Sequence, residues 1–373
     1  MASATRVDSL VMRGQASARI HINGRKLINF AGCSYLALGN LPEIRNAAVH
    51  AIEGGAAFAL QIPAAYGLVD PDIRDVERAA ADYCGTQEAV YLPSGYLIGA
   101  AALVTLDTSR SHLFIDEQAH FSLFDAARLT GRPVVPFRHC DSESLANAIR
   151  TSLAPQMRPV VLSDGVFGTT GRVAPLDDYA SVLAPYDARL VVDEAHSFGV
   201  LGRTGRGAAE HHAVDAVTVT AATLSKAFCA QGAIIPCSDE AAARVRSLPP
   251  LRGANAGSPI SAAVAAAAIR HAQAHPERRR RLIELAVYLR ARLRTIGIEV
   301  RDTPAPIVAF QLGDRAAMAA LQGQLFQHGI HVMVSSYIGS GAEGMVRCAV
   351  FADHSEADLD ALVDCLGRHE WTC

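Results

Sequence analysis

Residues 189–226 read RLVVDEAHSFGVLGRTGRGAAEHHAVDAVTVTAATLSK, and this stretch decides the fold. It contains two short apolar runs, 189–192 and 216–222, and each is followed by polar residues. Continuous apolar runs of this length are typical of buried strands in a parallel sheet. In open α/β sheets, ligands bind at the carboxyl ends of such strands. The stretch therefore predicts that Asp193, His196 and Lys226 meet at one edge of a sheet.

An acid, an imidazole and a lysine at one edge suit pyridoxal phosphate. This cofactor needs an amine that holds it as a Schiff base and a carboxylate that keeps its ring nitrogen protonated. Lys226 supplies the amine, Asp193 supplies the carboxylate, and His196 is placed to reach the ring hydroxyl. Each residue taken alone has an ordinary alternative, because a lysine after a strand is usually solvated and an aspartate can cap a turn.

The letters DEAH at 193–196 also mark the magnesium-binding strand of some helicases. That interpretation requires a phosphate loop of the form G-x-x-x-x-G-K-[ST], and the sequence contains none. The motif therefore does not indicate a helicase.

Composition favours a soluble protein whose partners are small molecules. The 373 residues are half hydrophobic and carry a net charge of −3, so no global field attracts nucleic acid or a membrane. The eight cysteines form no C-x-x-C pair, which leaves a metal site unsupported, and no secretory signal is visible. Apolar pieces such as 262–269 are too short for a bilayer crossing of about 20 residues. We expect reduced thiols and a cytoplasmic location.

Strands alternate with helices through most of the chain. Apolar runs at 89–92, 113–116, 134–137 and 160–163 each precede a helical pattern. This alternation predicts an α/β fold with a mostly parallel sheet covered by helices on both faces. A smaller α/β unit follows, with strands at 307–312, 331–334 and 345–351. We divide the chain into an N-terminal arm (1–40), a large cofactor-binding domain (41–250) and a small domain with connecting helices (251–373).

Two further segments add candidate cofactor contacts. Ser94, Gly95 and Tyr96 stand between the strand at 89–92 and a helix near 97–106, where backbone N–H groups can cradle a phosphate. An ordinary capped helix explains the same letters equally well. His120 follows the strand at 113–116, so its ring could lie on the cofactor face. A lone histidine is nevertheless more often a surface or packing residue.

Arg347 lies among apolar residues in the strand at 345–351. A guanidinium is costly to bury unless it meets an anion, because it cannot be neutralised. A bidentate contact with a substrate carboxylate and an internal salt bridge explain it equally well.

Taken together, the motifs resemble those of the α-oxoamine synthases, which are fold-type I pyridoxal phosphate enzymes. The resemblance covers about residues 27–365. It rests on SGY at 94, AH ending at 120, SDGVF at 163, VDEAHSFGVLG at 192, GRG at 205, TLSKA at 223 and VRCAV at 346. It implies decarboxylative condensation of an amino acid with an acyl thioester, delivered by CoA or a carrier protein, to give an α-aminoketone.

The resemblance also implies a role for each matching position. Lys226 would hold the cofactor and act as the base, His120 would stack on the ring, Asp193 would pair with the ring nitrogen and His196 with the ring hydroxyl. Ser94, Gly95, Tyr96 and Thr223 would hold the phosphate, and Arg347 would hold the substrate carboxylate. Family members are homodimers, so Asn255 would reach the neighbour's phosphate.

Several positions depart from the family pattern. Cys33 replaces an asparagine, Asp164 is one methylene shorter than the usual glutamate, and Gly168 replaces a serine. Residues 56–67, AAFALQIPAAYG, are bulkier than the expected glycine-rich stretch. Here, and in YLALGN and DEAHS, the chain looks closest to the autoinducer synthase branch. We place Cys33 and Asp164 with Arg347 as substrate-binding residues. Another fold-type I activity such as aminotransfer, or a non-catalytic ligand-binding homologue, remains an alternative.

Overall fold

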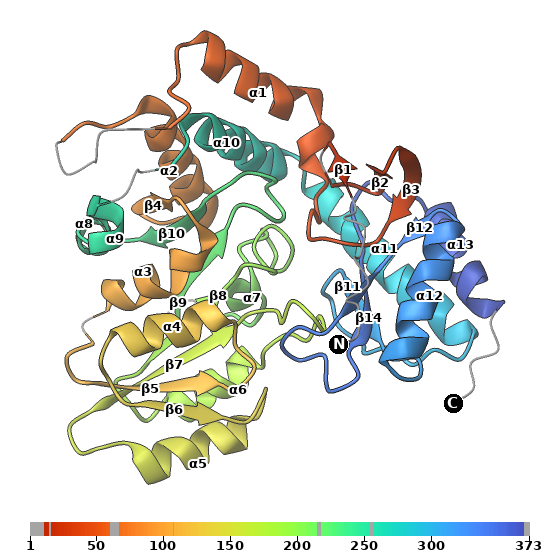
Figure 1. Ribbon diagram of the computed structural model, residues 1–373. Helices are drawn as coiled ribbons and strands as arrows, with labels where there is room; N and C mark the ends of the chain where they lie inside the picture. Colours follow the sequence, from red (N-terminus) through yellow and green to blue (C-terminus); the bar gives the residue numbers. More distant parts are fainter. Residues whose placement is uncertain are drawn as a thin grey trace, which may run out of the picture.

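A computed structural model describes residues 11–14, 16–59, 67–106, 108–214, 218–253 and 257–368. Figure 1 shows a larger unit built around one extended sheet and a smaller unit beside it, which contains the C-terminal helices. Among the described residues, no helix combines the length and the apolar character that a membrane crossing requires.

A seven-stranded sheet forms the centre of the larger unit. Its strands in spatial order are β4 (Glu88–Leu92), β10 (Ala233–Cys237), β9 (Thr218–Thr223), β8 (Arg189–Asp193), β7 (Arg158–Asp164), β5 (Ser111–Asp116) and β6 (Val134–Phe137). β10 pairs antiparallel with both of its neighbours, and every other pairing in the sheet is parallel. The prediction of a mostly parallel sheet is confirmed, with one reversed strand.

Helices cover both faces of this sheet, as predicted. Their bounds are α2 (Pro71–Cys84), α3 (Ile98–Thr105), α4 (Phe121–Leu129), α5 (Ser142–Ser152), α6 (Leu176–Leu183), α7 (Ala208–His211), α8 (Asp239–Arg246) and α9 (Pro249–Gly253). Successive residues of β7 enter opposite clusters, because Val160 and Leu162 pack with α3 and α4 residues whereas Val161 packs with α5 and α6 residues. A strand buried on both faces reads as a continuous apolar run for this reason.

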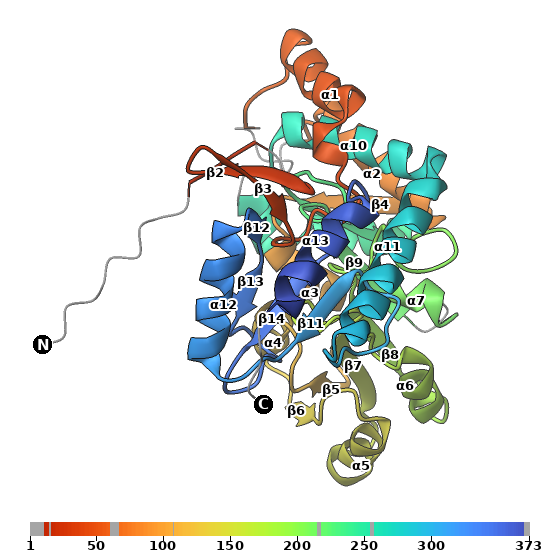
Figure 2. The same cartoon turned by 90° about the vertical axis from the view of Figure 1, so that its right-hand side faces the viewer.

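The N-terminal arm pairs with the small unit. β1 (Met12–Arg13), β2 (Arg19–Ile22) and β3 (Arg25–Asn29) precede the short helix η1 (Leu38–Asn40) and α1 (Pro42–Glu53). Asn23 and Gly24 both have positive φ, 49° and 78°, which the predicted two-residue hairpin turn requires. β3 then pairs in parallel with β12 (Ile330–His331), and Figure 2 shows this junction.

The small unit has its own sheet of β11 (Ile307–Phe310), β14 (Met345–Ala349) and β13 (Met333–Ser335). Around it lie α11 (Pro276–Thr295), α12 (Arg315–Gln327) and α13 (Glu356–Gly367). The single strand expected at 331–334 was wrong, because β12 and β13 belong to different sheets. Ser355 and Asp358 form a capping box at the start of α13.

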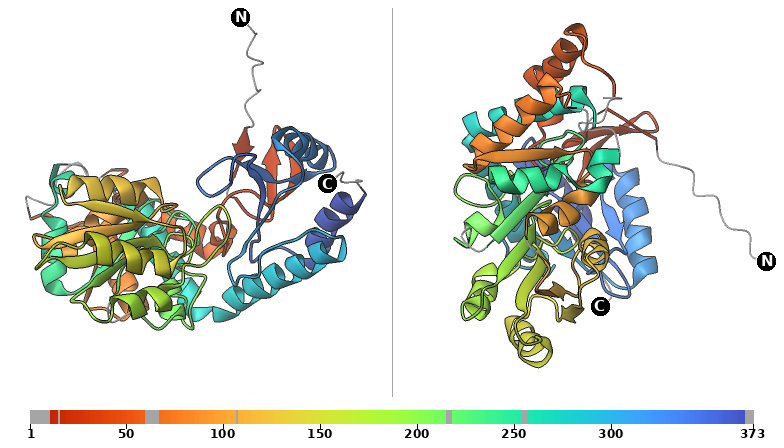
Figure 3. Two further views of the ribbon diagram at one scale, coloured as in Figure 1. Left: turned by 90° about the horizontal axis from the view of Figure 1, so that it is seen from below. Right: turned by 90° about the vertical axis from the view of Figure 1, so that its left-hand side faces the viewer.

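The two long helices after the large sheet connect the units. α10 (Pro259–Ala274) packs against α2 and α1, whereas α11 packs against α13 and β11. Figure 3 shows α11 extending along the small unit. The domain boundary at residue 250 stays a prediction. α10 follows that boundary in the sequence but packs against helices that precede it, α1 and α2.

Candidate active site

Three strands of the large sheet end at the candidate site. Asp164 is the last residue of β7 and Asp193 the last of β8, and the two are paired in register. Thr223 ends β9, the next strand along, and Lys226 follows it by three residues. The carboxyl ends of parallel strands lie at one edge of a sheet, which is where ligands bind in this architecture. Asp193, His196 and Lys226, which were predicted to meet at one edge of the sheet, line one cavity there.

Lys226 contacts the partly buried His196. Its Nζ lies 2.9 Å from Nε2 of His196, and Nδ1 of His196 lies 2.6 Å from the hydroxyl of Tyr35. Burial, followed by the positive charges of Lys226 and Arg347, holds the pKa of His196 well below its usual value. The imidazole is therefore neutral at neutral pH, with one nitrogen as donor and the other as acceptor.

Asp164 and Asp193 are buried side by side. Burial raises the pKa of both carboxyls, and the charge of Asp193 raises that of Asp164 further. Lys226 and a hydrogen bond of 2.9 Å from the Ala195 N–H favour the ionised form of Asp193. We therefore assign the negative charge to Asp193. Asp164 accepts a hydrogen bond from the His120 N–H at 2.8 Å.

The turn after β4, Ser94 to Tyr96, forms a cradle of backbone N–H groups, and its shape requires a glycine. Ser94 caps the short helix η3 (Gly95–Leu97), and its Oγ accepts a hydrogen bond from the Tyr96 N–H at 3.2 Å. A Cβ at Gly95 would lie 2.8 Å from Oγ1 of Thr223, so only glycine fits this approach. Oγ1 of Thr223 lies 2.8 Å from Oγ of Ser225, a further hydroxyl of this cavity that was not predicted from the sequence.

Two cavities share one wall. The first, of about 330 Å³, contains the cradle, Asp193 and Thr223. The second, of about 280 Å³, contains Cys33, Arg347 and residues of the small unit. The residues that line both are His120, Asp164, His196 and Lys226. A molecule in either cavity therefore lies beside the lysine.

Arg347 is buried at the second cavity, with 4% of its surface exposed. Its Nε donates to the Gly168 carbonyl at 2.6 Å and its Nη1 to the Gly32 carbonyl at 3.0 Å. Its Nη2 lies 3.5 Å from Sγ of Cys33 and 3.3 Å from the Tyr35 hydroxyl. No carboxylate in the described part of the chain forms an ion pair with it, so the internal salt bridge considered from the sequence is not found there.

Three comparisons with known proteins agree with this geometry. Residues 25–366 match the family described as aminotransferase class I and II. A putative 8-amino-7-oxononanoate synthase from Desulfovibrio desulfuricans is 32% identical, covering 91% of this chain and 88% of its own length. Serine palmitoyltransferase from Sphingomonas wittichii is 25% identical with a TM-score of 0.89, covering 96% of this chain and 91% of that chain. A structure described as SPT with the PLP internal aldimine is 25% identical with a TM-score of 0.90, covering 96% and 92%.

The chain belongs to the α-oxoamine synthase family, a branch of the class I and II aminotransferases. The fold-type I architecture and the dependence on pyridoxal phosphate that the sequence predicted are confirmed.

The residues of this α-oxoamine synthase fit the cofactor chemically. The cradle above β4 offers backbone N–H groups to a phosphate, and Asp193 offers a buried carboxylate to a protonated ring nitrogen. The sequence contains two lysines, Lys26 and Lys226. Lys26 is exposed in β3, so Lys226 is the lysine that lies in the cavity.

Tyr337 of the α-oxoamine synthase is a site residue that was not predicted from the sequence. This residue follows β13 in the small unit, and its hydroxyl lies 3.0 Å from Nε2 of His120. The other ring nitrogen of His120 lies 2.7 Å from Oγ of Ser122, so both nitrogens of this histidine are engaged. Tyr337 stands in an irregular glycine-rich loop, where neither periodicity nor a motif identifies it.

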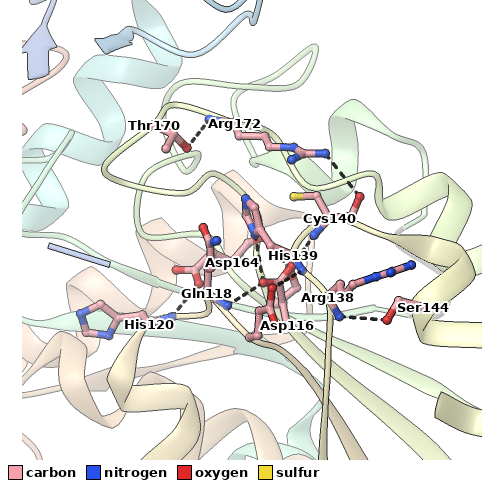
Figure 4. Close-up of polar contacts among 12 residues, drawn as sticks. Asp116, Gln118, His120, Arg138, His139, Cys140, Ser144, Asp164, Thr170 and Arg172 are labelled. Atoms are coloured by element: carbon pink, nitrogen blue, oxygen red, sulfur yellow. Dashed lines mark hydrogen bonds and ion pairs between the residues drawn. The ribbon is translucent and has the colours of Figure 1, made fainter. Parts of the chain in front are cut away.

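A second network supports the loop that carries His120 (Figure 4). Asp116 at the end of β5 accepts hydrogen bonds from the N–H groups of Gln118 and Cys140, at 2.9 and 2.8 Å, and contacts Nδ1 of His139 at 3.0 Å. Asp116, His139 and Cys140 are close enough to ligate a cation together. The hydroxyl of Tyr179 makes a fourth contact with the Asp116 carboxylate at 3.4 Å, so its lone pairs are used and we assign the cluster a structural role.

One predicted cofactor residue cannot be placed. Asn255 lies outside the described residues. The other predicted positions, including Ser94, Gly95, Tyr96 and Cys33, all line one of the two cavities.

Proposed function

We propose that the protein catalyses the pyridoxal phosphate-dependent condensation of an amino acid with an acyl thioester, with loss of carbon dioxide, to give an α-aminoketone. One observation carries the proposal. Arg347, a buried guanidinium without a carboxylate partner among the described residues, lines the same cavity as Lys226. A substrate that carries a carboxylate and reacts near a lysine is what this pair would recognise.

The first cavity would hold the cofactor. Gly95, Tyr96 and Thr223 with Ser94 would bind its phosphate, and Asp193 would keep its ring nitrogen protonated. The bound cofactor supplies an electron sink that stabilises negative charge at the substrate α-carbon.

The two histidines of the shared wall would orient that ring. His196 would direct its Nε2 toward the ring hydroxyl, because its Nδ1 is already bonded to Tyr35. His120 would lie against the ring face. Burial lowers the pKa of His120, so a neutral ring would meet the protonated pyridine without charge repulsion.

The second cavity would hold the amino acid. Arg347 would bind its carboxylate, replacing the long contact of 3.5 Å between its Nη2 and Cys33. Lys226, which lines both cavities, would then remove the α-proton. The α-carbon would attack the thioester carbonyl and the thiolate would leave. The carboxylate would then depart as carbon dioxide, and the proton held by Lys226 would return to the α-carbon. Asp164, protonated beside Asp193, would keep this wall from carrying a second negative charge.

An assay with a carboxyl-labelled amino acid and an acyl-CoA tests this function. Condensation releases labelled carbon dioxide and free CoA in equal amounts. Formation of pyridoxamine phosphate without thiol release would instead establish aminotransfer. A non-catalytic homologue would show no exchange of the α-proton with deuterated solvent for any amino acid tested.

We also infer a cytoplasmic homodimer. Apolar side chains of α1 and the segment after it are exposed, notably Ile52 and Phe58, at 50% and 81%. If Asn255 reaches the neighbour's phosphate, a mixture of Lys226→Ala and Asn255→Ala subunits rebuilds one intact site in each mixed dimer. Activity that exceeds that of either variant alone would support the shared site, and an unchanged sum would contradict it.

A further inference from the structure

Tyr35 connects the two ends of the proposed site. Its hydroxyl lies 3.3 Å from Nη2 of Arg347 and 2.6 Å from Nδ1 of His196, and its ring is fully buried. On the far side of the imidazole, Nε2 of His196 lies 2.9 Å from Nζ of Lys226. A continuous line of hydrogen-bonding groups therefore runs from the guanidinium to the catalytic lysine.

The chemistry of the three groups gives this line a direction. A guanidinium only donates hydrogen bonds, so it occupies a lone pair of the Tyr35 oxygen. Burial raises the pKa of Tyr35 well above its usual value, so the phenol keeps its proton. Once Lys226 is attached to the cofactor, its nitrogen is no longer a free ammonium. The phenol proton is then available to Nδ1 of His196, which leaves Nε2 as the nitrogen that carries the imidazole hydrogen toward the cofactor.

Other charged and titratable groups surround this line. Lys226, Arg347 and His120 face the imidazole of His196, and Cys33 together with Arg347 faces the Tyr35 hydroxyl. Arg347 acts on the imidazole by charge as well as through the phenol. A test of the phenol must separate these two effects.

We propose that Tyr35 is a positioning residue that couples the occupancy of Arg347 to the proton on His196. The proposal rests on the function proposed above, and it adds a signal from the substrate carboxylate to the cofactor-facing nitrogen. A carboxylate on Arg347 neutralises the guanidinium and competes for its Nη2–H. The phenol then donates less strongly to Nδ1, because hydrogen bonds in a chain polarise one another. Nε2 in turn becomes a weaker donor toward the cofactor.

This coupling gives the site a way to recognise an amino acid before chemistry begins. An amine without a carboxylate leaves Arg347 and Tyr35 in contact, so the proton on His196 stays as it is in the free enzyme. An amino acid places a carboxylate on Arg347 and thereby weakens the hydrogen bond that His196 donates through Nε2. The hydrogen-bonding environment of the cofactor would thus differ between the two ligands, although both bind beside the same lysine.

The holoenzyme with Tyr35→Phe tests the coupling, using propionate as a carboxylate that cannot react. The measurements are the pH titration of the cofactor's visible absorbance, with and without propionate, and propionate binding by calorimetry. In the unmodified enzyme, propionate should move the titration midpoint by about half a pH unit or more. In Tyr35→Phe, propionate should still bind but the midpoint should stay in place. We expect kcat to fall about tenfold, as for loss of one buried hydrogen bond.

Tyr83→Phe is the matched control. It also removes a buried phenol hydroxyl, one that donates to the carbonyls of Thr204 and Gly205 and lines neither cavity, and it should keep the full propionate response. A propionate shift of unmodified size in Tyr35→Phe would overturn the proposal, because the charge of Arg347 would then act through space alone. Propionate that binds the unmodified enzyme without moving the midpoint would overturn it equally.

A second measurement covers the case in which Tyr35→Phe does not fold. Replacing tyrosine by 3-fluorotyrosine in a Tyr96→Phe, Tyr337→Phe background, which lacks both phenols that line the cavities, makes the remaining phenols stronger donors and keeps their shape. The cofactor titration should then shift without propionate, and an unchanged titration would contradict the coupling. None of these measurements requires product. A failed condensation assay would therefore overturn the proposed function, whereas the coupling through Tyr35 would still be decided by the titrations.

Discussion

The sheet edge and the cavity beside the small unit are built in opposite ways. At the edge, Asp164, Asp193 and Thr223 are ordered by neighbouring parallel strands, and Lys226 follows within a few residues. In the second cavity, Cys33 comes from the arm, whose Tyr35 contacts Arg347, and Arg347 and Tyr337 come from the small unit. The first region has its geometry fixed by backbone ladders. The second exists only where three separate parts of the chain meet, so its side chains can change without disturbing the strands.

The largest expected effect tests the sheet edge. Lys226→Ala should lower kcat by roughly 10⁴-fold or more, because it removes both the attachment point and the base. Borohydride treatment followed by peptide mapping should place a pyridoxyl group on Lys226 in the unmodified protein and none in the variant. Lys26→Ala, which changes the other lysine, should keep full activity and labelling. A label on any other residue would remove Lys226 from the site.

Arg347→Ala tests the second cavity. It should lower kcat/KM by about a hundredfold, since removing a buried charged partner costs about 3 kcal/mol. Cofactor content should be unchanged, because Arg347 does not line the first cavity. Calorimetry with the amino acid and the absorbance of bound cofactor measure the two effects separately. Equal loss of cofactor and amino acid would mean that the two regions are not independent.

His354 tests the junction that holds the second region together. It lies between Phe30 of the arm and Phe351 of the small unit, with ring centroids 4.7 and 5.4 Å away. Burial lowers the pKa of His354 to about 4, from 6.5 when exposed. The unfolded chain therefore binds more protons below pH 6.5, and stability falls as the pH drops from 6.5 toward 4.

Between pH 7 and pH 5, the single-site contribution of His354 is a loss of about 2 kcal/mol in the free energy of unfolding. Urea titrations at the two pH values measure it. His354→Asn should reduce the loss by that amount, because the amide oxygen can accept the Phe351 N–H without titrating. An identical pH dependence in the variant would contradict this account of the junction.

The smallest effect concerns Tyr337. Tyr337→Phe keeps the ring and removes the hydrogen bond to His120, so we expect kcat to fall about threefold to tenfold. Tyr186→Phe serves as a control because that exposed tyrosine is remote from both cavities. A loss as large as that of Arg347→Ala would show that the loop after β13 contributes more than orientation of one ring.

The same contrast explains what could be predicted from the sequence. Asp193, His196 and Lys226 were found because buried parallel strands leave apolar runs that end at the functional residues. Arg347 was found because a cation within an apolar strand is anomalous. Tyr35 and Tyr337 gave no such signal, since a tyrosine in an apolar arm or a loop is ordinary. Their roles depend on contacts across 161 and 217 residues of chain, which no local pattern records.

Four side chains form the common wall of both cavities, so substitutions at those four positions are poorly tolerated. A substitution there that reshaped the substrate space would also disturb the cofactor. New substrate preferences must therefore arise from the outer surfaces, where Cys33, Met333 and Tyr337 stand clear of the first cavity. Libraries for directed evolution are best confined to those three positions, where many variants should remain competent catalysts.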